Sequence, residues 1–188
     1  MNNSIFESII TIFSRFSRLG SLVAVVAGTV LCALPTDAAE TIRYVALVDH
    51  GVKAGEQVVV HGDDGWTRVH FIYKDNGRGP ELDEQFRLAD DGTYANYDVE
   101  GTSTFGGPVD EHFSRSGTRA KWHSPSEQGH AKVSGTKLYV PMYGTYETAS
   151  VAVGAIARQA DQRVALLPSG TLSSRILDQV EISSGDHT

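Results

Sequence analysis

Histidine is the side chain in this sequence best suited to bind a metal or to move a proton near neutral pH. Hydrolytic metal sites bring two or three imidazoles onto one ion, often from His-x-His or His-Glu-x-x-His spacing. Neither spacing occurs here. The histidines in the body of the chain are dispersed: His50, His61, His70, His112, His123 and His130. The pattern predicts ordinary surface or half-buried histidines, with no metal ligand and no cofactor.

The triplet Asp110-Glu111-His112 is the most suggestive local cluster. In a strand, Glu111 lies on the side of Val109 and Phe113, while Asp110 and His112 share the opposite side. We expect Asp110 and His112 to touch, which would raise the histidine pKa. A solvated strand edge is the favoured interpretation. The only candidates for an interaction surface are weak ones: Asp110, His112, Trp122 and His123.

Other catalytic signatures are missing from the sequence. No Gly-x-Ser-x-Gly elbow and no calcium loop of alternating acids occurs. Paired carboxylates of the glycosidase kind need two acids held across a cleft, and no spacing here singles out a pair. We therefore predict no catalytic and no cofactor-binding residue, and expect the chain not to act as an enzyme on its own.

Aromatic residues on the predicted strands allow two interpretations. They could line a pocket for a lipid or another small hydrophobe, or they could form the core and its cross-strand pairs. The core interpretation is favoured. The residues concerned are Trp66, Tyr73, Tyr94, Tyr97, Trp122 and Tyr139.

The first 39 residues resemble a secretory signal peptide. Arg15 and Arg18 precede an uncharged run from Leu19 to Thr36, and Thr36-Asp37-Ala38-Ala39 resembles a cleavage site. We expect this segment to be cleaved, which would remove Cys32, the only cysteine. The predicted location is periplasmic or secreted. The alternative is a retained N-terminal membrane anchor, since the run is near the lower length for a spanning helix.

The formal net charge of −7 limits the partners. An acidic chain lacks the lysine and arginine clusters that bind nucleic acid or anionic membrane surfaces. We expect no nucleic-acid partner and no stable membrane insertion after signal cleavage. The remaining length predicts a single β-rich domain over residues 40–182, with a disordered tail over 183–188.

Short alternating runs separated by turn residues predict a mainly β, or α+β, fold: a curved antiparallel meander with one helix packed across it. Glycines and Asp-Gly turns recur between the runs. The expected strands of the meander are 42–48, 56–61, 66–74, 81–88, 93–100, 109–115 and 118–124. In the fourth of these, Leu82, Phe86 and Leu88 face inward; in the fifth, Ala95, Tyr97 and Val99 share one side.

Beyond Ser124 the pattern changes. Residues 125–135 are predicted to be a polar loop, and residues 137–140 a brief strand. Thr145 is a candidate N-cap for a helix over 146–159. Strands over 163–167 and 172–182 are expected to close the domain. The residues that fall at helical spacing are Tyr146, Ala149, Val153, Ile156 and Ala160.

Several segments together resemble the N-terminal region of exported bacterial metal-dependent amidohydrolases. They are Asp75-Asn76-Gly77-Arg78-Gly79-Pro80, Pro108-Val109-Asp110-Glu111-His112-Phe113, Ala120-Lys121-Trp122 with Glu127-Gln128-Gly129, and Arg163-Val164-Ala165-Leu166-Leu167-Pro168-Ser169-Gly170. The resemblance implies that a metal-binding barrel, carrying the catalytic residues, follows this region in the family. None of those residues maps onto this sequence.

The resemblance therefore implies a non-catalytic accessory β domain, as a truncated or standalone fragment whose partner is a missing barrel. Hydrolase activity is expected only if such a barrel completes it. The alternative is a periplasmic module that binds a lipid or another hydrophobic small ligand.

Overall fold

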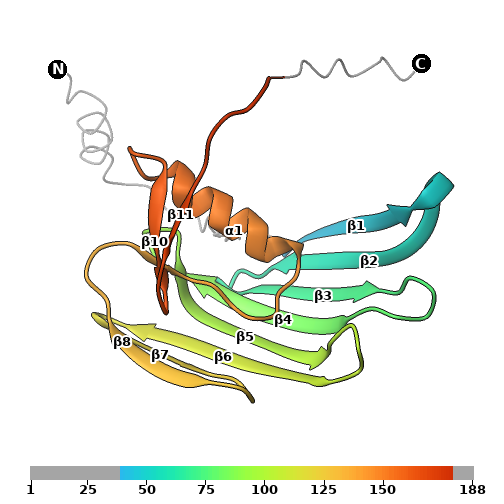
Figure 1. The fold of residues 1–188 in the computed structure, drawn as a ribbon, viewed down its shortest axis with the longest axis horizontal. Coiled ribbons are helices and arrows are strands. Elements are labelled where there is room, and N and C mark those ends of the chain that lie inside the picture. Colours follow the sequence, from blue (N-terminus) through green and yellow to red (C-terminus); the bar gives the residue numbers. More distant parts are fainter. Residues whose placement is uncertain (1–38, 180–188) are drawn as a thin grey trace, which may run out of the picture. The chain divides into compact units, whose positions relative to one another are not determined.

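The computed structural model describes residues 39–179. The predicted signal peptide, apart from Ala39, and the predicted disordered tail lie outside these residues. The described part of the chain is mainly β, with one α-helix, which confirms the predicted fold class (Figure 1).

An eight-stranded antiparallel meander, β1 to β8, forms most of the domain, and its strands lie in chain order. Consecutive runs of alternating residues are joined by short turns, so each strand pairs with the next. The strands are β1 Glu40–Val48, β2 Val52–His61, β3 Thr67–Tyr73, β4 Glu81–Leu88, β5 Tyr94–Thr102, β6 Pro108–Ser116, β7 Arg119–His123 and β8 Gln128–Lys132. A short 3₁₀ turn, Asp49–Gly51, joins β1 to β2.

Two details of the meander differ from the predictions. Leu88, the last residue of β4, is 39% exposed, although it pairs with the core residue Tyr94. The register shifts between Arg87 and Leu88, where β5 has the extra residue Ala95, so Tyr94 rather than Ala95 lies in the core beside Tyr97. A β-bulge adds one residue to one strand and reverses the side on which the following side chains point.

The predicted polar loop over residues 125–135 is also wrong, because it contains β8. Gly129 explains how so polar a segment joins the sheet. It pairs with Trp122, and a Cβ at this position would lie 2.3 Å from the indole Cζ2. Only glycine leaves room for that ring, so β8 completes the sheet next to the most bulky residue of β7.

A second, three-stranded sheet follows the meander. Its order is β11-β10-β9, from β9 Lys137–Tyr139, β10 Arg163–Leu167 and β11 Thr171–Ser173. β9 and β10 are parallel, and helix α1, Tyr146–Ala157, connects them. The predicted strand over 172–182 is therefore too long: after Ser173, the described residues to 179 have no regular structure.

Helix α1 starts where the sequence predicts, but it buries a different stripe. Thr145 caps its N-terminus, with its hydroxyl accepting a hydrogen bond from the Glu147 amide at 3.2 Å. The buried residues are Val151, Ala155 and Ile156, whereas Val153 is exposed. This short, alanine-rich helix has two neighbouring stripes of apolar residues at i, i+4 spacing. Packing against the sheets buries the stripe that does not contain Val153.

One face of the meander, here called the inner face, packs against α1 and the second sheet. The core interpretation is confirmed for Tyr94, Tyr97, Trp122 and Tyr139, which are buried: Phe113 stacks on Tyr139 at 4.4 Å between ring centroids, and Tyr97 contacts Tyr94 at 5.0 Å. It is wrong for Trp66, which is not among the core residues. The opposite face, here called the outer face, carries the alternate side chains of the same strands, most of them exposed or half-buried.

Candidate functional site

Three polar side chains lie among the apolar residues of the inner face: Gln57 on β2, Glu84 on β4 and Glu111 on β6. We call them the polar clamp. All three are buried, with Glu84 and Glu111 each 2% exposed. Buried polar groups are costly unless they are hydrogen-bonded, so their partners decide what they do.

Glu111 binds the chain between β9 and α1. One carboxylate oxygen accepts from the Tyr139 hydroxyl at 2.6 Å and from the Met142 amide at 3.0 Å. The other accepts from the amides of Met142 and Tyr143, at 3.0 and 3.2 Å. Every partner is a donor. The site therefore requires an acceptor at both oxygens, which an ionised carboxylate provides.

Glu84 has fewer hydrogen-bond donors around its carboxyl group than Glu111 has. Its Oε2 accepts from the Thr145 amide at 2.9 Å and lies 3.1 Å from the Tyr97 hydroxyl. That hydroxyl has one proton for two acceptors, Glu84 Oε2 and the nearer Tyr143 carbonyl at 2.7 Å. Burial raises the pKa of Glu84, against the lowering effect of the hydrogen bonds from the Thr145 amide and the Tyr97 hydroxyl.

Gln57 completes the clamp at the start of the helix. Its carbonyl oxygen accepts from the Tyr146 amide at 3.0 Å, and its amide nitrogen donates to Glu147 at 3.2 Å. Across β6, β4 and β2, the clamp therefore holds successive backbone amides between residues 142 and 146. This contact pattern seats α1 on the sheet and leaves both glutamates inaccessible to any substrate.

Period-two alternation places Glu111 inward correctly, and it would place Glu84 inward too, between Leu82 and Phe86. The sequence carries no signal for their partners, because those are backbone amides some 30 and 60 residues away. The one indication in the sequence that these glutamates have a special role is a charged residue at an inward position of an otherwise apolar strand face.

The outer face carries a second polar arrangement. Cross-strand pairing aligns Arg68 with Gln85, Gln85 with Asp98, Asp98 with His112, and His112 with His123. Gln128 of β8 extends the line from His123. We call this line the outer polar row: Arg68, Gln85, Asp98, His112, His123 and Gln128.

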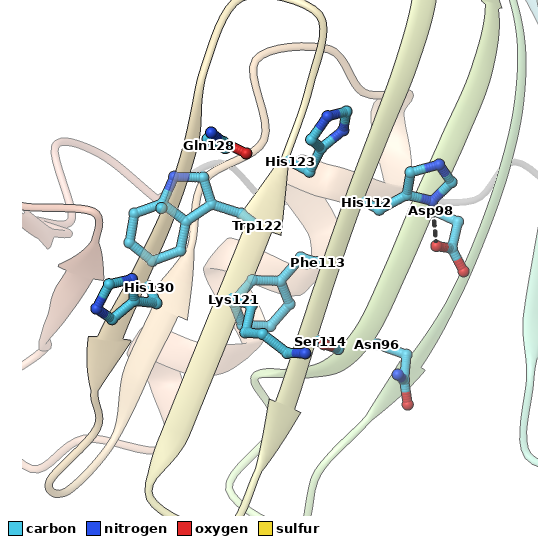
Figure 2. A pocket seen from close by; sticks show the side chains of 11 residues that line it. Asn96, Asp98, His112, Phe113, Ser114, Lys121, Trp122, His123, Gln128 and His130 are labelled. Atoms are coloured by element: carbon cyan, nitrogen blue, oxygen red, sulfur yellow. Dashed lines mark hydrogen bonds and ion pairs between the residues drawn. The ribbon is translucent and has the colours of Figure 1, made fainter.

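His112 bridges two carboxylates at the centre of the row, and Figure 2 shows its contact with one of them, Asp98. Its Nδ1 lies 2.7 Å from Asp98 Oδ1, and its Nε2 lies 2.8 Å from Asp110 Oδ1. Carboxylate oxygens only accept, so both contacts are hydrogen bonds when the ring is an imidazolium. The hydrogen bond to Asp98, with a contribution from Asp110, raises the pKa of His112.

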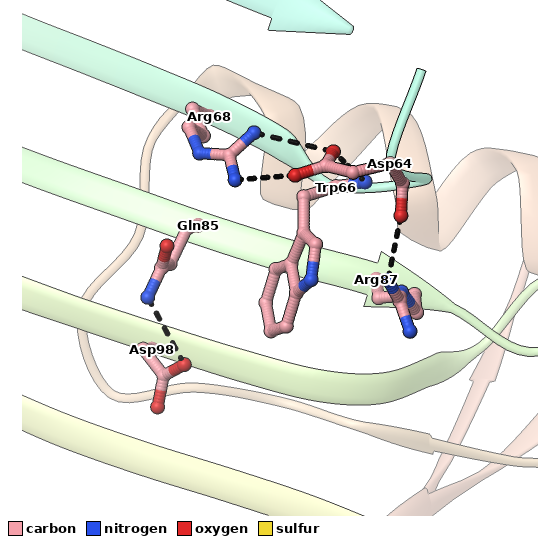
Figure 3. A network of polar contacts seen from close by, with 6 residues as sticks. All are labelled: Asp64, Trp66, Arg68, Gln85, Arg87 and Asp98. Carbon is pink, nitrogen blue, oxygen red and sulfur yellow. Dashed lines mark hydrogen bonds and ion pairs between the residues drawn. The ribbon is translucent and has the colours of Figure 1, made fainter. Parts of the chain in front are cut away.

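The first end of the row lies beside Trp66. Figure 3 shows its indole over β4, between the side chains of Gln85 and Arg87, and the Arg87 guanidinium lies 5.2 Å from the ring centroid. Arg68 binds Asp64 with both terminal nitrogens, at 3.3 and 2.7 Å. This ion pair and the Trp66 amide lower the pKa of Asp64 to about 2.

The four sequence candidates do not form one cluster. Asp110, His112 and His123 share the outer face, and the predicted contact of Asp110 with His112 is present. The Trp122 ring pairs with Phe113 on the inner face and packs against Tyr139, although Trp122 also borders the hollow lined by His112 and His123. Sequence reasoning missed the role of Asp98, which comes from β5 and joins His112 only through strand pairing.

Two shallow hollows adjoin on the outer face, and both are lined by Asp98 and His112. One, of about 530 Å³, extends over Arg68, His70 and Gln85. The other, of about 770 Å³, extends over Lys121 and His123. Within residues 39–179, no group of three His, Cys, Asp or Glu side chains is arranged to hold a metal ion.

None of the helices in the described range is long and apolar enough to cross a lipid bilayer. Comparison with known proteins gives no match: no family model, no curated protein and no solved structure is similar to this chain.

Proposed function

We propose that this chain is a non-catalytic, exported β domain that docks against a partner domain, as the N-terminal region of an exported amidohydrolase accompanies its barrel. The observation that carries the proposal is the exposed apolar surface of the β1–β2 hairpin. Tyr44, Val45, Leu47 and Val52 are 47%, 51%, 63% and 61% exposed. A cluster of exposed apolar side chains commonly marks an interaction site.

The position of the hairpin supports docking. β1 is the edge strand of the meander, and on its free side no other described strand pairs with it. It offers nine residues of backbone together with apolar side chains on both faces. Edge strands that are not meant to pair are usually short, charged, covered or bulged. β1 is long and has no charged residue over Tyr44–Leu47, and its irregularity lies at the end of this range, between Ala46 and Leu47.

The buried carboxylates support a non-catalytic role. Glu84 and Glu111 are the acids one would first consider for general acid–base chemistry, since burial and unusual protonation often mark such groups. Here, each is closed to solvent and bonded to backbone amides of its own chain. Their chemistry serves the packing of α1.

Two assays on the purified protein test this proposal. A hydrophobic dye should bind the wild type, and Leu47→Lys with Val45→Lys should reduce dye binding without lowering the melting temperature. Val153→Lys, on the exposed face of α1, is the matched control. Absence of dye binding to the wild type would contradict docking through the hairpin. Metal-dependent, chelator-sensitive hydrolysis of cyclic amides would contradict the non-catalytic role.

A second candidate function is binding of a small hydrophobe. A hollow of about 410 Å³ lies between α1 and the second sheet. Its lining is mainly apolar: Leu138, Val140, Ala149, Ala152, Leu166 and Leu172. A fluorescent fatty acid should bind there, and Ala152→Phe should abolish binding while Ala157→Phe, on the exposed side of the helix, does not. Equal fatty-acid binding by both variants would show that this hollow is not the binding site.

A further inference from the structure

The outer face is a large surface that the proposed docking through the hairpin does not use. Helix α1 and the second sheet cover the inner face, and no described element packs on the outer one. The outer polar row crosses six strands there, from Arg68 on β3 to Gln128 on β8. A face this rich in hydrogen-bonding groups is available to a ligand.

The row mixes donors and acceptors, and this restricts the ligand. Asp110 keeps one oxygen beyond its His112 contact, while the second oxygen of Asp98 accepts a long hydrogen bond, 3.5 Å, from the Gln85 amide nitrogen. Gln85, His123 and Gln128 carry both donors and acceptors. Acidic groups disfavour polyanions, and Arg68, Lys121 and the imidazolium of His112 disfavour polycations. Val58 and Val60 add an apolar lining at the β2 end of this face. A neutral ligand with many hydroxyls satisfies both kinds of group, because each hydroxyl donates and accepts.

The geometry favours a linear ligand that runs across the strands. Neighbouring strands lie about 4.8 Å apart, so the row presents one polar side chain at each such step. This step is close to the length of one pyranose ring in an extended glycan. The two hollows overlap at Asp98 and His112 and follow the same direction, one from β2 to β6 and the other from β5 to β8.

Trp66 adds an apolar element at one end of the row. Its indole lies on the outer face next to Gln85, held by Arg87 (Figure 3). The flat C–H face of a sugar ring can pack on an aromatic side chain, while its hydroxyls bond to polar neighbours. We propose that the outer polar row, with Trp66, binds an extended neutral oligosaccharide that crosses the strands.

Calorimetric titration of the full chain with cellohexaose and chitohexaose tests this proposal. We expect saturable binding of at least one of them, and at least a tenfold loss of affinity in Asp98→Ala and in Gln85→Ala. Two variants at separate positions guard against a folding defect in one, and circular dichroism checks each. Asp178→Ala, outside the row, is the matched control and should bind as the wild type does.

Tryptophan fluorescence gives a second readout. The chain has two tryptophans, and Trp122 is in the core, so a change on sugar binding should vanish in Trp66→Phe. Lack of binding to both sugars, or unchanged affinity in Asp98→Ala and Gln85→Ala, would overturn the proposal, as would tighter binding of oligolysine. The double variant Val45→Lys, Leu47→Lys should bind sugar normally, which separates this site from the docking hairpin.

Discussion

Glu84 and Glu111 lie on either side of Val99 in the same row of the sheet, yet their hydrogen-bond partners differ. Glu111 meets donors only. Glu84 accepts from one amide and shares the single Tyr97 proton with the Tyr143 carbonyl, and its other oxygen has no partner. The same side chain on alternate strands therefore has donors at both oxygens in one place and at only one oxygen in the other.

This difference predicts unequal effects of the same substitution. Glu111→Gln should lower the free energy of unfolding by about 1–3 kcal/mol, because its NH₂ would face amide and hydroxyl donors. Glu84→Gln should cost less, since a neutral amide still accepts from the Thr145 amide. Urea unfolding of both variants measures this. A larger loss in Glu84→Gln would contradict this account of the two hydrogen-bond environments.

The pH dependence of Glu84 follows from its raised pKa. An acid whose folded-state pKa exceeds its unfolded value stabilises the fold below the unfolded pKa, and that contribution is lost as pH rises through the folded pKa. Glutamine does not ionise, so Glu84→Gln does not lose this stability at higher pH. The free energy of unfolding of the variant, relative to the wild type, should therefore rise as pH increases. The same denaturation series, repeated across pH, reveals this trend.

His112 gives a second prediction at this scale. Its pKa in the folded protein should exceed the ordinary value of 6.5, and Asp98→Asn should lower it more than Asp110→Asn. The stability that the bridge contributes is present below the unfolded pKa and lost as pH rises through the folded one. The ring is 55% exposed, so the effect on stability should be small. An NMR titration in which neither variant lowers the pKa would contradict the bridge.

Among the elements, helix α1 depends on its first turn. Thr145 caps it, and the clamp fixes the amides around the cap. Thr145→Ala should lower the free energy of unfolding by about 1 kcal/mol, whereas Thr145→Ser keeps the hydroxyl and should cost less. Equal losses, measured by thermal or urea unfolding, would show that the methyl group of this buried threonine matters more than its cap.

The sequence predicts elements well where local chemistry decides them. Alternation and turns locate the seven strands β1 to β7, and the Thr145 cap locates the start of α1. The sequence-based prediction fails where contacts between residues far apart in the chain determine the structure. β8 depends on the fit of Gly129 over Trp122, and the buried stripe of α1 depends on the sheets on either side. The partners of the clamp and the Asp98–His112 contact arise only once strands pair.

At the scale of the molecule, three surfaces have different chemistry. The inner face is filled by apolar side chains and by a clamp that fastens the helix. The outer face is polar, and the β1–β2 hairpin is apolar and exposed at the sheet edge. This division favours a domain that joins a partner through its edge and meets a second ligand on its open face.

Photo-crosslinking in the cells that export the protein tests the docking proposal most directly. A photoreactive amino acid at position 47 should give one discrete adduct, and mass spectrometry should identify the partner as a polypeptide with a His-x-His metal barrel. The same probe at position 178 is the control and should give none. No adduct from position 47, or the same adduct from both positions, would contradict docking through the hairpin.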